Sequence, residues 1–212
     1  EAAASSPPFL HLPPHNLFTL RAERLERLAV GHPLAEYLRL IAGLCRAQQQ
    51  VLDEPPSTGP IDQQRLALCQ QHGLPPFGAD TLIREDDWQA WLEALLQRYT
   101  APEQPAVIDA IATLRSADSG QLRSWGVALV SGQYSMVPAQ LVPFLGAALQ
   151  TAWSHWLLSA PNLQLKPGDS LSQCPACGSP AMIGVVRHRG KHNGLRYLVC
   201  SLCACEWHVV RV

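Results

Sequence analysis

The sequence lacks the short motifs by which many enzymes are recognised. It contains no G-x-S-x-G elbow, no glycine-rich phosphate loop and no H-E-x-x-H metalloprotease motif. The acidic run Glu85–Asp87 is explained as the solvated start of a helix, where negative charge is favourable. No candidate catalytic residue is left, so the sequence predicts a protein that is not an enzyme.

The chain also shows neither a secretory leader nor a strong charge of one sign. Residues 1–15 are rich in proline, with no basic segment followed by an apolar run. Residues 1–165 hold ten arginines against fifteen acidic residues, and residues 166–212 hold six basic against two acidic residues. Four thiolates and a divalent metal would reduce this C-terminal excess to about +2, and phosphate binders usually carry more. We expect a cytoplasmic protein for which nucleic acid is not a favoured partner.

The seven cysteines are not spread along the chain as a disulfide framework would be. Five of them fall between Cys174 and Cys205, whereas Cys45 and Cys69 stand alone in helical patterns. In a reducing compartment, paired cysteines more often bind metal than form disulfides.

Most of the chain has helical periodicity. We expect helices beginning at Leu17 behind an Asn16 N-cap and at Pro33, and further helices near residues 62–72, 85–99, 102–114, 121–129 and 138–160. The last of these is long enough to span a bilayer, but Gln140, Gln150, Ser154 and His155 interrupt it and no basic flank orients it. It is therefore expected to be a buried core helix, without membrane insertion.

After a linker at residues 161–173 the pattern changes to short β-type runs. The hydrophobic runs at residues 183–186, 197–199 and 207–210 alternate with turns, one of them at Gly190–Gly194. The predicted fold is mainly α, with a multi-helix domain followed by a small metal-stapled β ribbon. The expected divisions are a flexible segment 1–15, a helical domain 16–165 and a ribbon 166–212. A ribbon this small buries little core, so metal is expected to supply most of its folding energy.

The ribbon carries two C-x-x-C pairs, Cys174/Cys177 and Cys200/Cys203. A hairpin that brings the two turns together makes a closed tetrahedral four-thiolate site for one iron or zinc ion. Such a site has no open coordination position for activating water or a carbonyl, so the metal is structural, or an electron-transfer centre if it is iron.

Several neighbouring residues are rivals for the metal. Cys205 follows Cys203 by two residues and could replace it, although a small buried or free thiol is the simpler interpretation. The other candidates are His188, His192 and His208, none of which has the spacing that displaces a cysteine. Gly178 suits the positive φ that such a turn often needs, and Ala204 suits it less well.

The segment from Gly194 to Cys203, GLRYLVCSLC, continued by EWHVVRV to Val212, resembles the FdhE-type formate dehydrogenase accessory proteins of bacteria. The stretch CPACGSP at Cys174–Pro180 is similar to the first metal knuckle of that family, and the RAERL and HPL stretches of the first helices resemble its N-terminal part. The likeness runs from about residue 16 to the end of the chain. Cys205 departs from it, since the family more often has a polar residue there.

The resemblance implies a non-enzymatic accessory or maturation factor for respiratory formate dehydrogenase. Such a factor acts in the cytoplasm and contacts the catalytic subunit of the enzyme before export. The resemblance also implies an α-helical N-terminal domain and two rubredoxin-like modules. The metal ligands that it implies are Cys174, Cys177, Cys200 and Cys203. A second module is expected beyond Val212, and a homodimer is left open.

The ribbon also offers candidate contacts with a partner. Glu206, Trp207 and His208 follow the second knuckle, and on a strand Trp207 and His208 point to opposite faces. The alternative is that Trp207 fills the small core of the ribbon. Two other functions stay open: a zinc ribbon that binds nucleic acid through Arg187, Arg189, Lys191 and Arg196, and a rubredoxin-like electron carrier.

Overall fold

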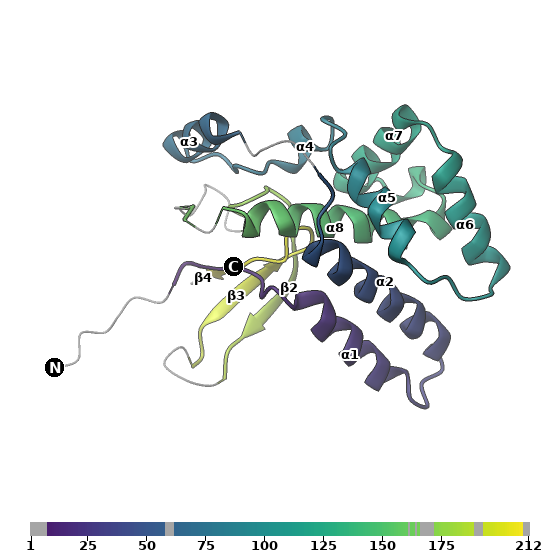
Figure 1. The fold of residues 1–212 in the computed structure, drawn as a ribbon. Helices are drawn as coiled ribbons and strands as arrows, with labels where there is room; N and C mark the ends of the chain where they lie inside the picture. Colours follow the sequence, from purple (N-terminus) through teal and green to yellow (C-terminus); the bar gives the residue numbers. More distant parts are fainter. Residues whose placement is uncertain are drawn as a thin grey trace.

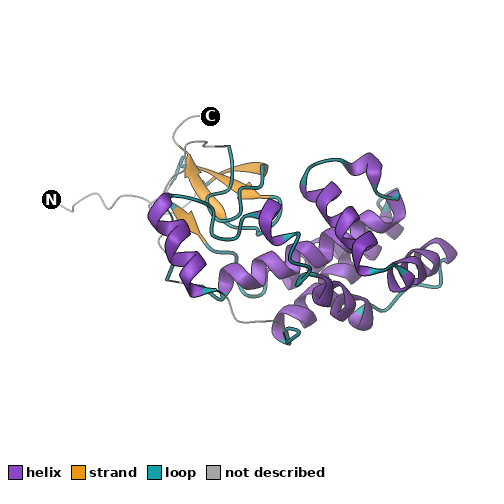
Figure 2. Ribbon diagram, turned by 90° about the horizontal axis from the view of Figure 1, so that it is seen from above, coloured by secondary structure: helices purple, strands orange, loops and turns teal. Residues whose placement is uncertain are grey.

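The computed structural model of the protein describes residues 8–57, 62–160, 162, 163, 165, 172–188 and 193–209. Within these residues, α-helices make up most of the molecule and one four-stranded antiparallel sheet lies at one end (Figure 1; Figure 2). The predicted class, mainly α with a small C-terminal β module, is confirmed.

The helices occupy most of the chain up to residue 158. They are α1 (Leu17–Ala29), α2 (Ala35–Asp53), α3 (Gln63–His72), α4 (Ala79–Leu82), α5 (Gln89–Arg98), α6 (Pro105–Ser116), α7 (Ser119–Val130) and α8 (Val142–Leu158), with 3-10 turns η1 (Tyr134–Met136) and η2 (Ala139–Leu141). The strands are β1 (Leu10–His11), β2 (Ala181–Val186), β3 (Arg196–Cys200) and β4 (Glu206–Val209).

Local chemistry explains several helix ends. Asp62 caps α3 by accepting hydrogen bonds from the N–H groups of Gln64 and Arg65, and Asp118 caps α7 in the same way through Gln121. Gly73 ends α3 in the left-handed conformation. The expected cap at Asn16 is wrong, because its side chain makes no capping hydrogen bond to α1.

Helix α8 lies across the middle of the molecule, with α2 and α5 packed against it (Figure 1). Trp153, Leu145 and Ala152 on it are completely buried, and hydrophobic residues cover most of its circumference. A helix that is apolar all round is one that meets protein on every side. No helix among the described residues has the length and apolar character needed to cross a membrane.

The sheet has the strand order β1-β4-β3-β2, with every neighbour antiparallel. Tyr197, Val199, Trp207 and Val209 of the two central strands are buried. The cysteines of the ribbon, together with Trp207 and Val209, belong to the same hydrophobic core as α2, α5 and α8. The ribbon therefore shares its core with the helices.

Strand β1 corrects the expectation of a flexible segment over residues 1–15 where that segment is described, at Leu10–His11; residues 1–7 lie outside the described residues. Leu10 pairs with Trp207 and His11 with Glu206, and the N–H of His208 donates to the carbonyl of Phe9 at 2.8 Å. The prolines around this segment prevent a helix, but an edge strand of two residues tolerates them as neighbours. Sequence periodicity cannot detect so short a strand.

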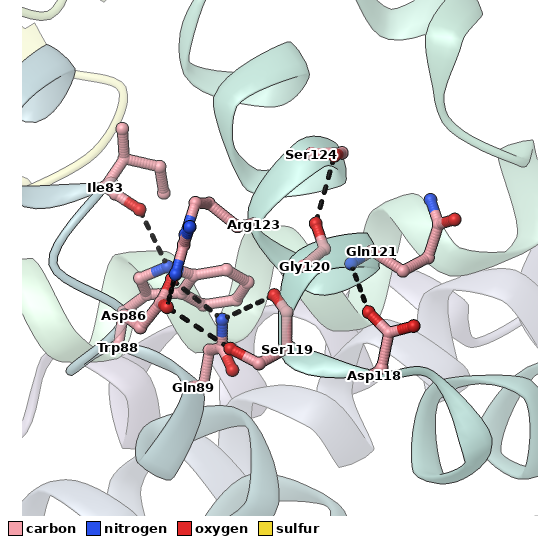
Figure 3. A network of polar contacts seen from close by, with 10 residues as sticks. All are labelled: Ile83, Asp86, Trp88, Gln89, Asp118, Ser119, Gly120, Gln121, Arg123 and Ser124. Atoms are coloured by element: carbon pink, nitrogen blue, oxygen red, sulfur yellow. Dashed lines mark hydrogen bonds and ion pairs between the residues drawn. The ribbon is translucent and has the colours of Figure 1, made fainter.

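Asp86, in the acidic run before α5, contacts residues of both α5 and α7 (Figure 3). Its backbone has a φ of 62°, and its carboxylate pairs with Arg123 of α7 and accepts hydrogen bonds from Gln89 and Ser119. The expected role at a helix N-terminus is thus incomplete, because Asp86 also joins α5 to α7.

We predict a pH-dependent effect of Asp86→Asn. Hydrogen bonding from Arg123 holds the pKa of Asp86 below its usual value. A carboxyl with a depressed folded-state pKa stabilises the fold above its unfolded pKa, about 3.9, and this contribution is lost as the pH falls through the folded-state pKa. Asparagine also tolerates the left-handed backbone, so the substitution removes mainly the charge.

Thermal denaturation followed by circular dichroism checks this prediction. The variant should melt at a lower temperature than the wild type at pH 7, and the difference should close as the pH falls below about 4. Asp109→Asn, at an exposed position on α6, is the matched control and should show no such difference. A difference in melting temperature that persists below about pH 4 would contradict the role given to the Asp86 carboxylate.

Candidate metal centre

The first cysteine pair lies on a tight turn just before β2. The N–H of Gly178 donates to the carbonyl of Cys174 at 2.8 Å, and the N–H of Cys174 donates to the carbonyl of Ser179 at 2.9 Å. Gly178 has a φ of 74°, which is the left-handed conformation that the sequence predicts for it. The N–H of Ala176 points at the Sγ of Cys174, 3.4 Å away.

The second pair repeats this turn at the end of β3. The N–H groups of Leu202 and Cys203 point at the Sγ of Cys200, at 3.3 and 3.4 Å. The N–H of Cys200 donates to the carbonyl of Cys205 at 2.9 Å. Ala204 takes the position of Gly178 and has a φ of 59°, an uncommon conformation for a residue with a Cβ atom. The second knuckle therefore adopts the same turn as the first, despite the conformational cost of a positive φ at Ala204.

The two turns face each other and bring four thiols together. The Sγ atoms of Cys174, Cys177, Cys200 and Cys203 all lie within 4.8 Å of one another, and all four residues are buried. The Sγ atoms of Cys174 and Cys203 are 3.6 Å apart, and those of Cys177 and Cys200 are 3.4 Å apart. Sulfurs bound tetrahedrally at about 2.3 Å from one ion would lie about 3.8 Å apart, so the cluster fits such an ion closely.

The electrostatics of the cluster also favour a cation. Burial opposes ionisation of Cys174, but hydrogen bonds from the neighbouring thiols outweigh it and hold the pKa of Cys174 well below its usual value. Burial, with the neighbouring sulfurs, raises the pKa of Cys177 and Cys203 well above theirs. Several buried thiolates in one place repel each other, and a metal ion at the centre would allow all four to ionise.

A fifth thiol borders the cluster on one side. The Sγ of Cys205 lies 3.3 Å from that of Cys174 and 3.5 Å from that of Cys203, and the residue is completely buried. The expectation of a small buried thiol therefore agrees with its burial. Its position beside two of the four sulfurs also keeps it the nearest rival ligand among the described residues.

The metal knuckles are bonded directly to the helical part of the protein. The N–H groups of Phe77 and Ala79 donate to the carbonyls of Ala176 and Cys177 at 2.9 and 3.0 Å. From α8, the Ser154 hydroxyl donates to the Cys203 carbonyl at 3.4 Å, and the Gln150 amide donates to the Ser201 carbonyl at 3.1 Å. The cluster thus lies where the ribbon joins the helices.

Trp153 completes this attachment. Its indole N–H donates to the carbonyl of Phe77 at 2.9 Å, so α8 holds the loop that in turn holds the first knuckle. Sequence reasoning missed these anchoring residues. They act through backbone carbonyls, which carry no sequence signal, and the tryptophan spacing of α8 indicated only a core position.

The three candidate contact residues of β4 have different environments. Trp207 is 1% exposed, so it fills the core and offers no surface to a partner. Glu206 is half-buried and pairs with Arg187, with their charged groups 2.6 Å apart. His208 is half-buried, and its ring lies 5.4 Å from that of Tyr197. The burial of Trp207 agrees with the alternative of a ribbon-core residue, and contact of Glu206 and His208 with a partner stays a prediction.

The rival sites are less well supported. His188 is exposed and is not among the clustered potential ligands of the described chain. Of the four basic residues considered for nucleic acid, Arg196 is exposed and Arg187 is paired with Glu206. His192, Arg189 and Lys191 lie outside the described residues.

Comparison with known proteins agrees with this architecture. A family model described as "FdhE, N-terminal" matches residues 6–169, and one described as "FdhE, central domain" matches residues 173–211. The chain belongs to the FdhE family. The second match contains both metal knuckles, and membership supports an accessory role connected with formate dehydrogenase.

Individual relatives match over the whole chain. "Protein FdhE homolog" from Pseudomonas putida is 63% identical over 212 residues, which is all of this chain and 67% of that protein. The Yersinia pestis homologue is 36% identical over 99% of this chain and 68% of its own length. The crystal structure of the FdhE protein from Pseudomonas aeruginosa superposes with a TM-score of 0.89 at 53% identity, over 97% of this chain and 70% of that one.

We predict that Cys203 and Cys205 differ in their effect on metal binding. Cys203→Ala removes a sulfur of the facing turns and should weaken metal binding about tenfold or more, whereas Cys205→Ala should retain one metal ion per chain. Elemental analysis, followed by competition with a chelator, checks both. Equal weakening by the two substitutions would show that Cys205 is a ligand.

Proposed function

We propose that the protein is a non-enzymatic maturation factor that binds the catalytic subunit of respiratory formate dehydrogenase in the cytoplasm. The family supports the connection with formate dehydrogenase. The observation that carries the rest of the proposal is the site itself, a closed set of four buried thiols bonded on both sides to the helical part.

The chemistry of the site supports a structural role for its metal. Four cysteine ligands around one iron or zinc ion fill a tetrahedral coordination sphere, so the ion has no position at which to activate a substrate. When bound, it supplies a rigid link between the two turns. The side chains around it exclude water and bond to backbone carbonyls, which fixes the ribbon on α8.

Other functions have less support from the described residues. A nucleic-acid surface would need free basic groups, and Arg187 is paired with Glu206 and lies over the ring of Tyr197. A rubredoxin-like electron carrier requires iron with a reversible one-electron couple. An absorption spectrum combined with elemental analysis separates these cases, since iron thiolates are coloured and zinc thiolates are not.

The test of the proposal is a combined binding and maturation assay. Cells that lack their own copy of this factor receive the wild type, Cys177→Ser or Cys69→Ser, and both formate dehydrogenase activity and recovery of its catalytic subunit are measured. We expect Cys177→Ser to lose metal and to lower both readouts several-fold, because the knuckle no longer holds the ribbon in place.

Cys69→Ser is the matched control, because Cys69 is a partly exposed cysteine on α3 away from the cluster. It should behave as the wild type. The proposal fails if Cys177→Ser stays folded without metal and still supports full enzyme activity. Undiminished activity in cells without any copy of the factor would remove the connection with formate dehydrogenase itself.

A further inference from the structure

A groove of about 840 Å³ is lined by residues of α1, α2 and α8 and by Met182 and Ile183 at the start of β2. It is separate from the thiol cluster. Each of the three helices contributes to the groove four residues at the spacing i, i+3, i+4 and i+7. These residues are Leu17, Leu20, Arg21 and Arg24 of α1, Ile41, Leu44, Cys45 and Gln48 of α2, and Pro143, Gly146, Ala147 and Gln150 of α8.

This arrangement fits a further helix. Residues at that spacing share one face of a helix. Three such faces border the groove, so a fourth helix could pack between them. The edge strand β2 is less suited to pairing with an extended peptide, because its register shifts between Ala181 and Ile183. Leu20, Met182 and Ile183 are about half exposed at the groove, which leaves apolar surface for an occupant to cover.

Charge defines the occupant further. The groove is lined by two cations, Arg21 and Arg24, and by no acidic residue. The Arg21 guanidinium donates to the Gln150 amide oxygen at 3.2 Å and lies over the ring of Phe18. Among the residues that the structure describes, no carboxylate pairs with either arginine. A half-buried guanidinium with most of its donors free favours an incoming carboxylate.

We propose that this groove binds an amphipathic helix of a partner protein, with an apolar stripe on its inner face and acidic residues beside that stripe. The apolar stripe would lie on Leu20 and Ile41, which line the groove and are at least partly exposed, and the carboxylates would meet Arg21 and Arg24 of α1. This goes beyond the proposed function, because it concerns a second surface of the protein and does not require formate dehydrogenase as the partner.

Gly146 offers a test that does not depend on damaging the fold. A Cβ atom added there meets nothing within 4 Å, and the residue is inside a helix, where other residues are more favourable than glycine. Gly146→Leu should therefore fold and fill the groove. Gly146→Ala adds the same helical preference with little volume and is the matched control.

The probe is a fluorescein-labelled peptide of about 18 residues, long enough for a stable helix, with leucines at i, i+3, i+4 and i+7 flanked by glutamates. Fluorescence anisotropy measures its affinity for the metal-loaded chain. We expect binding by the wild type and by Gly146→Ala, and loss of binding by Gly146→Leu. Equal binding by all three, or no binding by the wild type, overturns the proposal.

A charge exchange tests the acidic component separately. Arg24→Glu should bind the glutamate peptide about tenfold more weakly and should regain affinity for a peptide with lysines in place of the glutamates. Arg27→Glu on the same helix is the control, since Arg27 is exposed and does not line the groove. If Arg27→Glu weakens binding equally, the groove is not the site.

Two other occupants give distinct results that would also overturn the proposal. A second copy of the chain would appear as a dimer in analytical ultracentrifugation that Gly146→Leu converts to a monomer. If further residues of the protein itself occupy the groove, these 212 residues should bind the peptide. A chain of the full length of the relatives should then fail to bind it.

Discussion

The structure depends most on the packing of four buried cysteines of the ribbon against the surface of the helices. Two C-x-x-C turns can face each other only if β2 and β3 pair in register, and their outward carbonyls are then fixed by Phe77, Ala79 and α8. Thiolates crowded without a cation repel one another, so a metal ion held by the four cysteines would balance the charge inside this junction. The same ion would then stabilise both the ribbon and the position of the ribbon on the helices.

This junction explains the composition of α8. Helix α8 packs against other helices and against the metal knuckles, and a narrow side at Pro143, Gly146 and Gln150 is partly open. This burial is why its sequence approaches that of a membrane span. Its few polar residues have structural tasks: Gln150 and Ser154 donate to knuckle carbonyls, and the buried Thr151 hydroxyl donates to the carbonyl of Ala147. The polarity of Gln150 and Ser154, which argued against a bilayer in the sequence, therefore reflects bonds to the ribbon.

Sequence reasoning succeeded where a residue acts through its own local pattern. The C-x-x-C spacing predicted the facing knuckles, Gly178 predicted a left-handed turn, and helical periodicity located the helices longer than the four-residue α4 to within a few residues. It failed where the partner is distant in the chain. Strand β1 exists because β4 has an open edge, and Asp86 is held by Arg123, thirty-seven residues further on. Trp207 was ambiguous because alternation along a strand does not tell which face is covered.

The groove and the metal centre are connected by a single side chain. The Gln150 amide accepts a hydrogen bond from Arg21 at the wall of the groove and donates one to the carbonyl of Ser201 in the second knuckle. An amide held at both ends cannot reorient without losing one bond, so the position of the knuckle influences the direction of the Arg21 guanidinium. A metal ion that fixes the knuckle would therefore also help to fix the charge that a helical partner meets. In this arrangement a metal site without an open coordination position would still contribute to recognition, because it would determine the shape of the surface next to it.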